Sequence, residues 1–179
     1  DQMKRLRTHG ITTDQLNMHS RPDSEIWNYQ QIELGFNYRM NDIEAALGKT
    51  QLTRIEENIN KRTKIAERYN KSLKNLPLTL PFQLSNSRSS FHLYPIRVNE
   101  SVSGKKQKDV YKRLCKANII ANLHYIPVYR QPFYEKMGFK KGYCPEAERF
   151  YKETISIPMF PSLKNKEINK VINTLWDIF

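Results

Sequence analysis

The alternation of apolar and polar residues divides this chain into helical and strand-like segments. The longest helical pattern covers residues 42–76, where apolar positions recur at alternating spacings of three and four. Pro77 ends the pattern, because the residue before a proline is kept out of the helical region. At 1.5 Å per residue this helix would be roughly 50 Å long. We therefore expect one long helix that bridges two parts of a larger molecule or contacts a second subunit.

Shorter elements precede and follow this helix. They are a helical tail at residues 1–9, strands at 78–80, 90–98, 119–123 and 154–157, and helices at 105–117, 145–152 and from Asn165 onward. Gly10 suits the end of the first helix, because the left-handed conformation common there costs glycine little. The order strand, helix, strand over residues 90–123 predicts a β-α-β unit, with a right-handed crossover if its strands are parallel. The polar loop at residues 12–30, which contains Trp27, is long enough to suggest a functional role.

Composition indicates a globular chain of one or two domains. Of its 179 residues, 39% are hydrophobic and 27% are charged, which is not the balance of a disordered tail. No run approaches the roughly 20 apolar residues of a membrane span, and residues 1–7 lack the apolar core of a signal peptide. Cys115 and Cys144 have no histidine at metal-ligand spacing. We expect reduced thiols, no metal, no membrane contact and a cytoplasmic protein.

A formal net charge of +12 makes a polyanionic partner worth weighing. The field of such a chain attracts phosphorylated small molecules as well as nucleic acids. The basic residues are spread along helices at ordinary solvent-facing positions, without an arginine-rich arm or a pair of RNA-stacking aromatics. A nucleic-acid-binding module is therefore kept as an alternative function. Two motifs carry the residues on which the main hypothesis rests.

The first motif begins at Gly35, immediately before the long helix. Asn41 can cap that helix while Glu44, three residues on, reaches back to the Asn41 backbone N–H in a capping box. The helix should therefore start at Asp42. Gly35 permits a turn or a close backbone approach that a Cβ would forbid.

Three polar side chains stand just ahead of that helix N-terminus. Asn37, Tyr38 and Arg39 supply an amide, a phenol and a guanidinium group, and such a place suits an anion. The structural alternative is a loop whose asparagine satisfies its own turn and whose arginine pairs with a carboxylate, since asparagine is an ordinary turn residue.

The second motif is the loop at residues 124–134, at the end of a predicted strand. It combines a histidine, three tyrosines and an arginine with two prolines, and loops after strands often carry ligand-contacting groups. His124 and Tyr125 are its leading candidates. In the structural alternative, the tyrosines bury their rings while their hydroxyls stay wet, and His124 is a hydrogen-bonded structural histidine.

The sequence of residues 35–42 resembles the G-[YF]-N-Y-R-[ML]-x-[DE] box of the DegT family of sugar aminotransferases. It reads Gly35-Phe36-Asn37-Tyr38-Arg39-Met40-Asn41-Asp42. These enzymes use pyridoxal 5'-phosphate (PLP) to aminate keto sugars carried on nucleotides. The resemblance implies that Asn37 crosses the interface of a homodimer and hydrogen-bonds the cofactor phosphate held by the partner subunit. It also implies that Arg39 is a second cofactor-binding residue and that Tyr38 lies beside the substrate.

The second motif, His124-Tyr125-Ile126-Pro127-Val128-Tyr129, is similar to the family segment H-Y-x-P-[VIL]-[YHN]. The family histidine lies beside the sugar nucleotide, so the resemblance implies that His124 and Tyr125 contact the substrate. The spelling looks closest to members acting on UDP-linked 4-keto-6-deoxy-N-acetylhexosamines, with an amino acid, glutamate, as amino donor. The expected role is then cell-surface polysaccharide or glycan biosynthesis.

The resemblance covers nearly all of this chain but only the carboxyl-terminal half of a family member. It implies an α/β fold, the small domain and interdomain helix of a fold-type I PLP-dependent transferase. The implied parts are the tail of the large domain with an interface loop at 1–40, the interdomain helix at 41–76 and the small domain at 77–179.

The family's cofactor-binding lysine lies in an S-x-x-x-x-K segment followed by glycines, and none of the 18 lysines here has that context. We therefore name no catalytic residue in this chain and expect it to be inactive by itself. A non-catalytic DegT-like regulator or scaffold is the second alternative function. Exposed apolar area on the long helix should make the isolated piece dimerise or aggregate.

Overall fold

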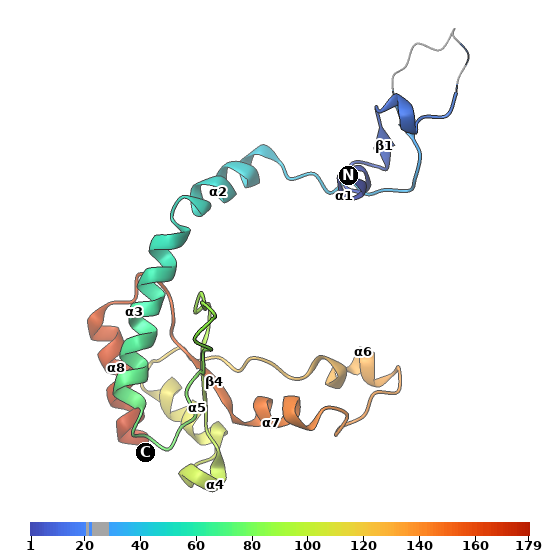
Figure 1. The fold of residues 1–179 in the computed structure, drawn as a ribbon. Coiled ribbons are helices and arrows are strands. Elements are labelled where there is room, and N and C mark those ends of the chain that lie inside the picture. Colours follow the sequence, from blue (N-terminus) through green and yellow to red (C-terminus); the bar gives the residue numbers. More distant parts are fainter. Residues whose placement is uncertain (21, 23–28) are drawn as a thin grey trace. The chain divides into compact units, whose positions relative to one another are not determined.

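The computed structural model describes residues 1–20, 22 and 29–179, so part of the long loop, including Trp27, lies outside the described residues. The chain falls into two compact units, Asp1–Thr53 (unit 1) and Arg54–Phe179 (unit 2). Figure 1 labels their elements along the chain. Within the described residues, no helix combines the length and the hydropathy that crossing a membrane requires.

Unit 1 is small and carries little regular structure. Its elements are α1 Gln2–Leu6, β1 Ile11–Thr12, η1 Gln15–Asn17, β2 Gln30–Gln31 and α2 Asp42–Leu52. β1 pairs antiparallel with β2. The first helix ends at Leu6 rather than at the predicted residue 9, because His9 and Gly10 both take left-handed backbone angles, with φ of 60° and 71°.

The helix predicted over residues 42–76 is divided into α2 and α3 (Ile55–Leu73). Arg54, between them, has φ −108° and ψ 4°, outside the α-helical range. The Thr53 hydroxyl donates to the Thr50 carbonyl oxygen at 2.8 Å. Such bonds from threonine to its own helix backbone compete with the helical ladder and bend or end it. The expectation of one continuous helix is therefore wrong, and the boundary between the units falls at this break.

The two helices differ in what they bury. Four side chains of α3 are buried in unit 2, whereas α2 buries none. On α2, Ile43 is 83% exposed and Leu47 is 61% exposed. The exposed apolar area expected from the sequence is thus present. Dimerisation of the piece, and the three-part division into domains, stay predictions.

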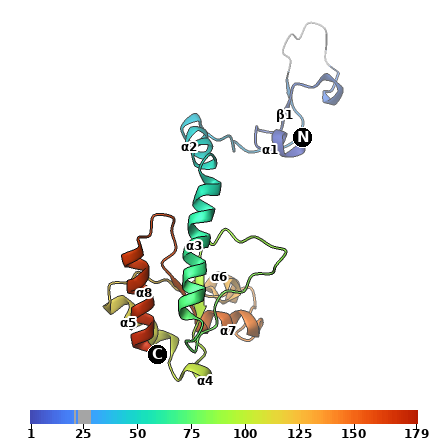
Figure 2. The same cartoon turned by 60° about the vertical axis from the view of Figure 1, so that its left-hand side comes forward.

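Unit 2 is a small antiparallel sheet packed against helices. Besides α3, its elements are β3 Tyr94–Arg97, α4 Glu100–Ser103, α5 Gln107–Lys116, η2 Val128–Arg130, α6 Pro132–Glu135, α7 Pro145–Glu153, β4 Thr154–Ile157 and α8 Asn165–Ile178. Helix α8 packs beside both α3 and α5, and its contact with α3 is visible in Figures 1 and 2. The core includes the rings of Tyr69 and Tyr94, whose centroids are 5.0 Å apart. Burial raises the pKa of both phenols, so they stay neutral at physiological pH.

Strand β4 lies at the centre of this sheet. It pairs antiparallel with β3 on one side, and Ser156 forms an antiparallel bridge with Asn122 on the other. The chain around Asn122 therefore runs in the same direction as β3, but β4 is inserted between them. The predicted β-α-β unit exists in this split form, and the predicted strand at 119–123 is reduced to a single bridge. The alternation of apolar and polar residues within a strand could not show that β4 would pair with β3 in place of the chain around Asn122.

Several boundaries in unit 2 agree with the sequence. Helix α7 begins at Pro145, as predicted, and β4 covers the predicted residues. Helix α5 ends with Asn118 in the left-handed conformation, with φ 54°, and the N–H of Ile119 reaches the Leu114 carbonyl at 3.0 Å, as in a Schellman motif. Trp176 on α8 is 47% exposed, and its indole N–H donates to the Ser72 carbonyl at 3.1 Å.

Candidate functional site

The first motif is held in unit 1 by backbone bonds to the end of α1. The N–H of Phe36 donates to the Leu6 carbonyl at 2.6 Å, and the N–H of Tyr38 donates to the Arg7 carbonyl at 2.9 Å. Carbonyls at a helix C-terminus lack partners within their own helix, which makes them available for this contact. Because alternate side chains of an extended segment point to opposite faces, Asn37 projects away from Phe36 and Tyr38.

The side chains of this motif form an exposed group of hydrogen-bond donors. Asn37, Tyr38 and Arg39 are all exposed. Arg39 Nε donates to Asn37 Oδ1 over a long 3.4 Å, which leaves the Asn37 NH₂ group for another acceptor. The Phe36 ring stacks on the Tyr38 ring, with centroids 4.8 Å apart and planes inclined by 9°. An amide NH₂ beside a guanidinium suits an oxyanion such as a phosphate.

Both local predictions for this motif are confirmed. Asn41 Oδ1 accepts from the Glu44 N–H at 2.9 Å, and Glu44 Oε2 accepts from the Asn41 N–H at 3.4 Å, which completes the capping box. A Cβ placed on Gly35 would lie 2.2 Å from the Gly10 backbone nitrogen. The glycine therefore permits the close approach of two backbone segments.

The second motif starts beside the central strand of unit 2. His124 Nδ1 lies 2.8 Å from the Ser156 hydroxyl oxygen. Ser156 also exchanges two backbone hydrogen bonds with Asn122, at 2.8 and 2.9 Å. The Tyr125 ring packs edge-on against the His124 ring at a centroid distance of 4.5 Å and is 70% exposed.

Sequence reasoning missed Ser156. A signal was available, because polar and apolar residues alternate in Thr154-Ile155-Ser156-Ile157 and so place Ser156 on the face opposite the two isoleucines. What the alternation could not show is the bridge to Asn122, which places that face next to His124.

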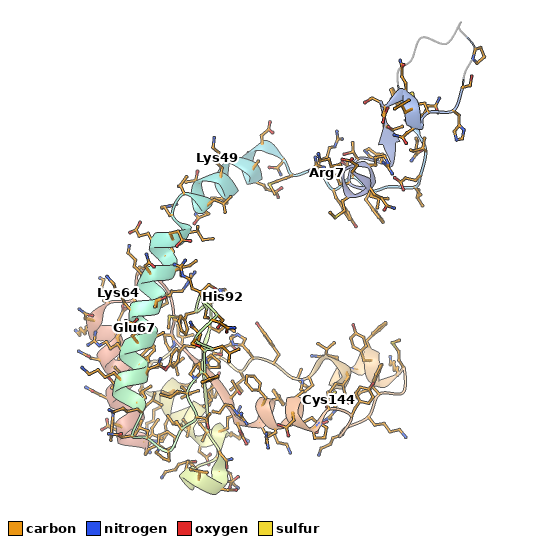
Figure 3. The ribbon with its side chains drawn as sticks, in the orientation of Figure 1. Arg7, Lys49, Lys64, Glu67, His92 and Cys144 are labelled. Atoms are coloured by element: carbon orange, nitrogen blue, oxygen red, sulfur yellow. The ribbon has the colours of Figure 1, made fainter. Side chains whose placement is uncertain are left out.

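Residues 124–144, here called the arm, connect His124 to the beginning of α7. Figure 3 labels Cys144 at that beginning, where it is the N-cap of the helix. Glu148 Oε1 accepts from the Gly142 N–H at 2.6 Å and from the Tyr129 hydroxyl at 2.7 Å. The Gly142 N–H, followed by the Tyr129 phenol, lowers the pKa of the Glu148 carboxyl. The ionised carboxylate thus ties both ends of the arm to α7.

We expect the arm to loosen in acid through Glu148. Because its pKa is lowered in the folded arm, the folded state binds fewer protons than the unfolded state below the ordinary glutamate pKa of about 4.3. The stabilisation is complete at neutral pH and is lost as the pH falls through the lowered pKa. Hydrogen-exchange protection of the arm, relative to α8, should therefore fall with the pH.

The substitution Glu148→Gln should weaken this protection at neutral pH and remove its pH dependence. Glu146→Gln is the matched control, because Glu146 lies on the same helix and pairs with Arg149 at the surface. Equal behaviour of the two variants would contradict the role of Glu148.

The structure thus groups the five predicted site residues by unit. Asn37, Tyr38 and Arg39 are neighbours in unit 1, and His124 and Tyr125 are neighbours in unit 2. Each group is accessible and carries hydrogen-bonding groups, which favours binding and orienting an oxygen-rich ligand.

A model of the DegT/DnrJ/EryC1/StrS aminotransferase family matches residues 1–176. A UDP-4-amino-4,6-dideoxy-N-acetyl-beta-L-altrosamine transaminase of Campylobacter jejuni is 34% identical over 180 residues, which cover 99% of this chain and 44% of the relative. The spore coat polysaccharide biosynthesis protein SpsC of Bacillus subtilis is 33% identical over 181 residues, which cover 99% of this chain and 46% of that protein.

Among solved structures, Helicobacter pylori PseC, an aminotransferase involved in the biosynthesis of pseudoaminic acid, superposes with a TM-score of 0.82. It is 28% identical, and the match covers 99% of this chain and 45% of PseC. The chain therefore spans less than half the length of the relatives that it matches.

Proposed function

Because this chain belongs to the DegT/DnrJ/EryC1/StrS aminotransferase family, we propose that it is the carboxyl-terminal part of an enzyme that aminates a nucleotide-linked keto sugar. The α/β fold is shared with PLP-dependent aminotransferases, and pyridoxal phosphate is the cofactor of the family. The proposed amino donor is glutamate, and the proposed product serves cell-surface polysaccharide or glycan synthesis.

The observation that carries this proposal is the free amide of the first motif. The Asn37 NH₂ and the Arg39 guanidinium fit a phosphate in chemistry, since both donate hydrogen bonds and both are exposed. We propose that Asn37 and Arg39 bind the cofactor phosphate held by the partner subunit of a homodimer. Bound PLP supplies an electron sink for amino transfer. The contribution of this motif is to fix the position of the phosphate.

We further propose that His124, Tyr125 and Tyr38 contact the nucleotide sugar. Tyr125 and Tyr38 are 70% and 72% exposed, so each offers a ring face and a hydroxyl for a sugar or a base. His124 is held by the central strand and can therefore orient a ligand at little entropic cost. The substrate proposed is a UDP-linked 4-keto-6-deoxy-N-acetylhexosamine.

The test uses the full-length protein that contains this chain. Supplied with PLP, glutamate and the UDP-linked keto sugar, it should release 2-oxoglutarate and amino sugar in equal amounts, measured by mass spectrometry. A protein that binds no PLP by absorbance would favour the regulatory or scaffold alternative. PLP uptake without amination of this sugar would contradict the proposed substrate alone. Light scattering should give the mass of a dimer.

A further inference from the structure

The hydroxyl through which β4 holds His124 belongs to Ser156. This residue is 5% exposed and lies in β4 between Ile155 and Ile157, whose side chains enter the core on the opposite face. A polar group buried at such a place needs a hydrogen-bond partner, because its loss of hydration otherwise costs free energy. Among the described residues, the partner of the hydroxyl is His124 Nδ1, at 2.8 Å.

The chemistry of a hydroxyl favours one direction of this hydrogen bond. Serine has one proton to donate and two lone pairs to accept with, and a buried donor without an acceptor is rarer than an unfilled lone pair. Donation from the Ser156 hydroxyl to His124 Nδ1, 2.8 Å away, gives this proton an acceptor, whereas the reverse direction leaves it without one among the described residues. The neutral imidazole then carries its own proton on Nε2.

We propose that Ser156 is a positioning residue that keeps His124 in the Nε2–H form, so that Nε2 donates a hydrogen bond to an oxygen of the ligand. The two backbone bonds between Ser156 and Asn122 fix the chain two residues before the histidine. The Tyr125 ring, packed edge-on, restricts the imidazole further. The hydrogen-bond direction is independent of the proposed function, whereas the identity of the ligand rests on it.

This arrangement assigns a chemical class to the ligand atom. An Nε2–H group fits a phosphate, carbonyl or sugar oxygen, all of which accept hydrogen bonds. With the opposite direction, Nδ1–H would donate to Ser156, and Nε2 would present a lone pair to a hydroxyl, an ammonium group or a proton. The direction of the hydrogen bond between Ser156 and His124 thus decides the role of Nε2. With Ser156 as the donor, Nε2 orients the ligand by donating to it, and with Nδ1 as the donor, Nε2 is available as a general base.

The test is to observe the imidazole nitrogens of the full-length protein by NMR with ¹⁵N-labelled histidine, well above the ordinary histidine pKa of about 6.5. The His124 signals are identified by their loss in His124→Gln. In the unchanged protein we expect one form, protonated on Nε2. Ser156→Ala should give a mixture of both forms, and Ser156→Thr, which keeps a hydroxyl, should restore the single form.

Thr154→Val is the matched control on the same strand. Thr154 is 1% exposed, and its hydroxyl has no hydrogen-bond partner within the part of the chain that the structure describes. Removing that hydroxyl should leave the His124 signals unchanged. A proton on Nδ1 in the unchanged protein, or a folded Ser156→Ala variant with unchanged His124 signals, would overturn the proposal.

A second measurement addresses the ligand, with uridine diphosphate as the probe in calorimetry. Ser156→Ala should weaken its binding about tenfold, the effect of roughly one hydrogen bond, while Thr154→Val should not. The His124 signals could respond as expected while neither the unchanged protein nor any variant binds uridine diphosphate. In that case the positioning role of Ser156 stands, and the substrate assignment of the proposed function fails. Equal affinity in all variants would overturn the donor role of Nε2.

Discussion

Replacement of Asn37 by aspartate is expected to weaken PLP retention by the full-length protein about a hundredfold. Aspartate has the size of asparagine and keeps the oxygen that accepts from Arg39. It loses the NH₂ donor and places a negative charge opposite the phosphate. A lost hydrogen bond to a charged group costs about 1.5–3 kcal/mol, and the repulsion adds to this cost. Cofactor release, followed by absorbance during dialysis, measures the effect.

This substitution separates the two explanations of the first motif. If Asn37 only satisfies its own loop, aspartate serves as well, because it can pair with Arg39 more strongly. Gln51→Glu is the control, since it adds the same charge at an exposed position of α2 in the same unit. Unchanged PLP retention in Asn37→Asp would show that this side chain does not hold the phosphate.

Replacement of Gly35 by alanine is expected to destabilise unit 1 by about 3 kcal/mol, the upper end of the usual range for a single substitution. The added Cβ would lie 2.2 Å from the Gly10 nitrogen, 2.6 Å from the His9 carbonyl carbon and 2.8 Å from the Leu6 carbonyl oxygen. All three are backbone atoms, so no side-chain rotation relieves the clash. The segment that carries Asn37 must then separate from α1.

The matched control is Gly48→Ala on α2. A Cβ at Gly48 meets nothing within 4 Å, and alanine in a helix is more stable than glycine by about 1 kcal/mol. Hydrogen exchange in residues 1–20 and 30–41 should accelerate in Gly35→Ala and not in Gly48→Ala. Similar exchange in the two variants would show that the backbone contact does not hold this loop in place.

The features that were correctly expected from the sequence have causes within a few residues. The capping box joins Asn41 to Glu44, and Pro145 begins α7 because its missing N–H is not needed in a first helical turn. Even the break after α2 has a local cause, the hydroxyls of Thr50 and Thr53. The apolar pattern continues across it, however, and that pattern dominated the prediction of a single helix.

The sequence by itself determined which side chains the two motifs carry and where α2, α7 and β4 begin, because capping, turn chemistry and alternation act between near neighbours. Tertiary structure alone decided that Gly35 packs on Gly10 and that Ser156 bonds to His124, 32 residues earlier in the chain. Such contacts depend on which segments pair, and pairing is set by the packing of the whole unit. The side chains of the two candidate groups can therefore be identified from the sequence, while their orientation is set by the fold.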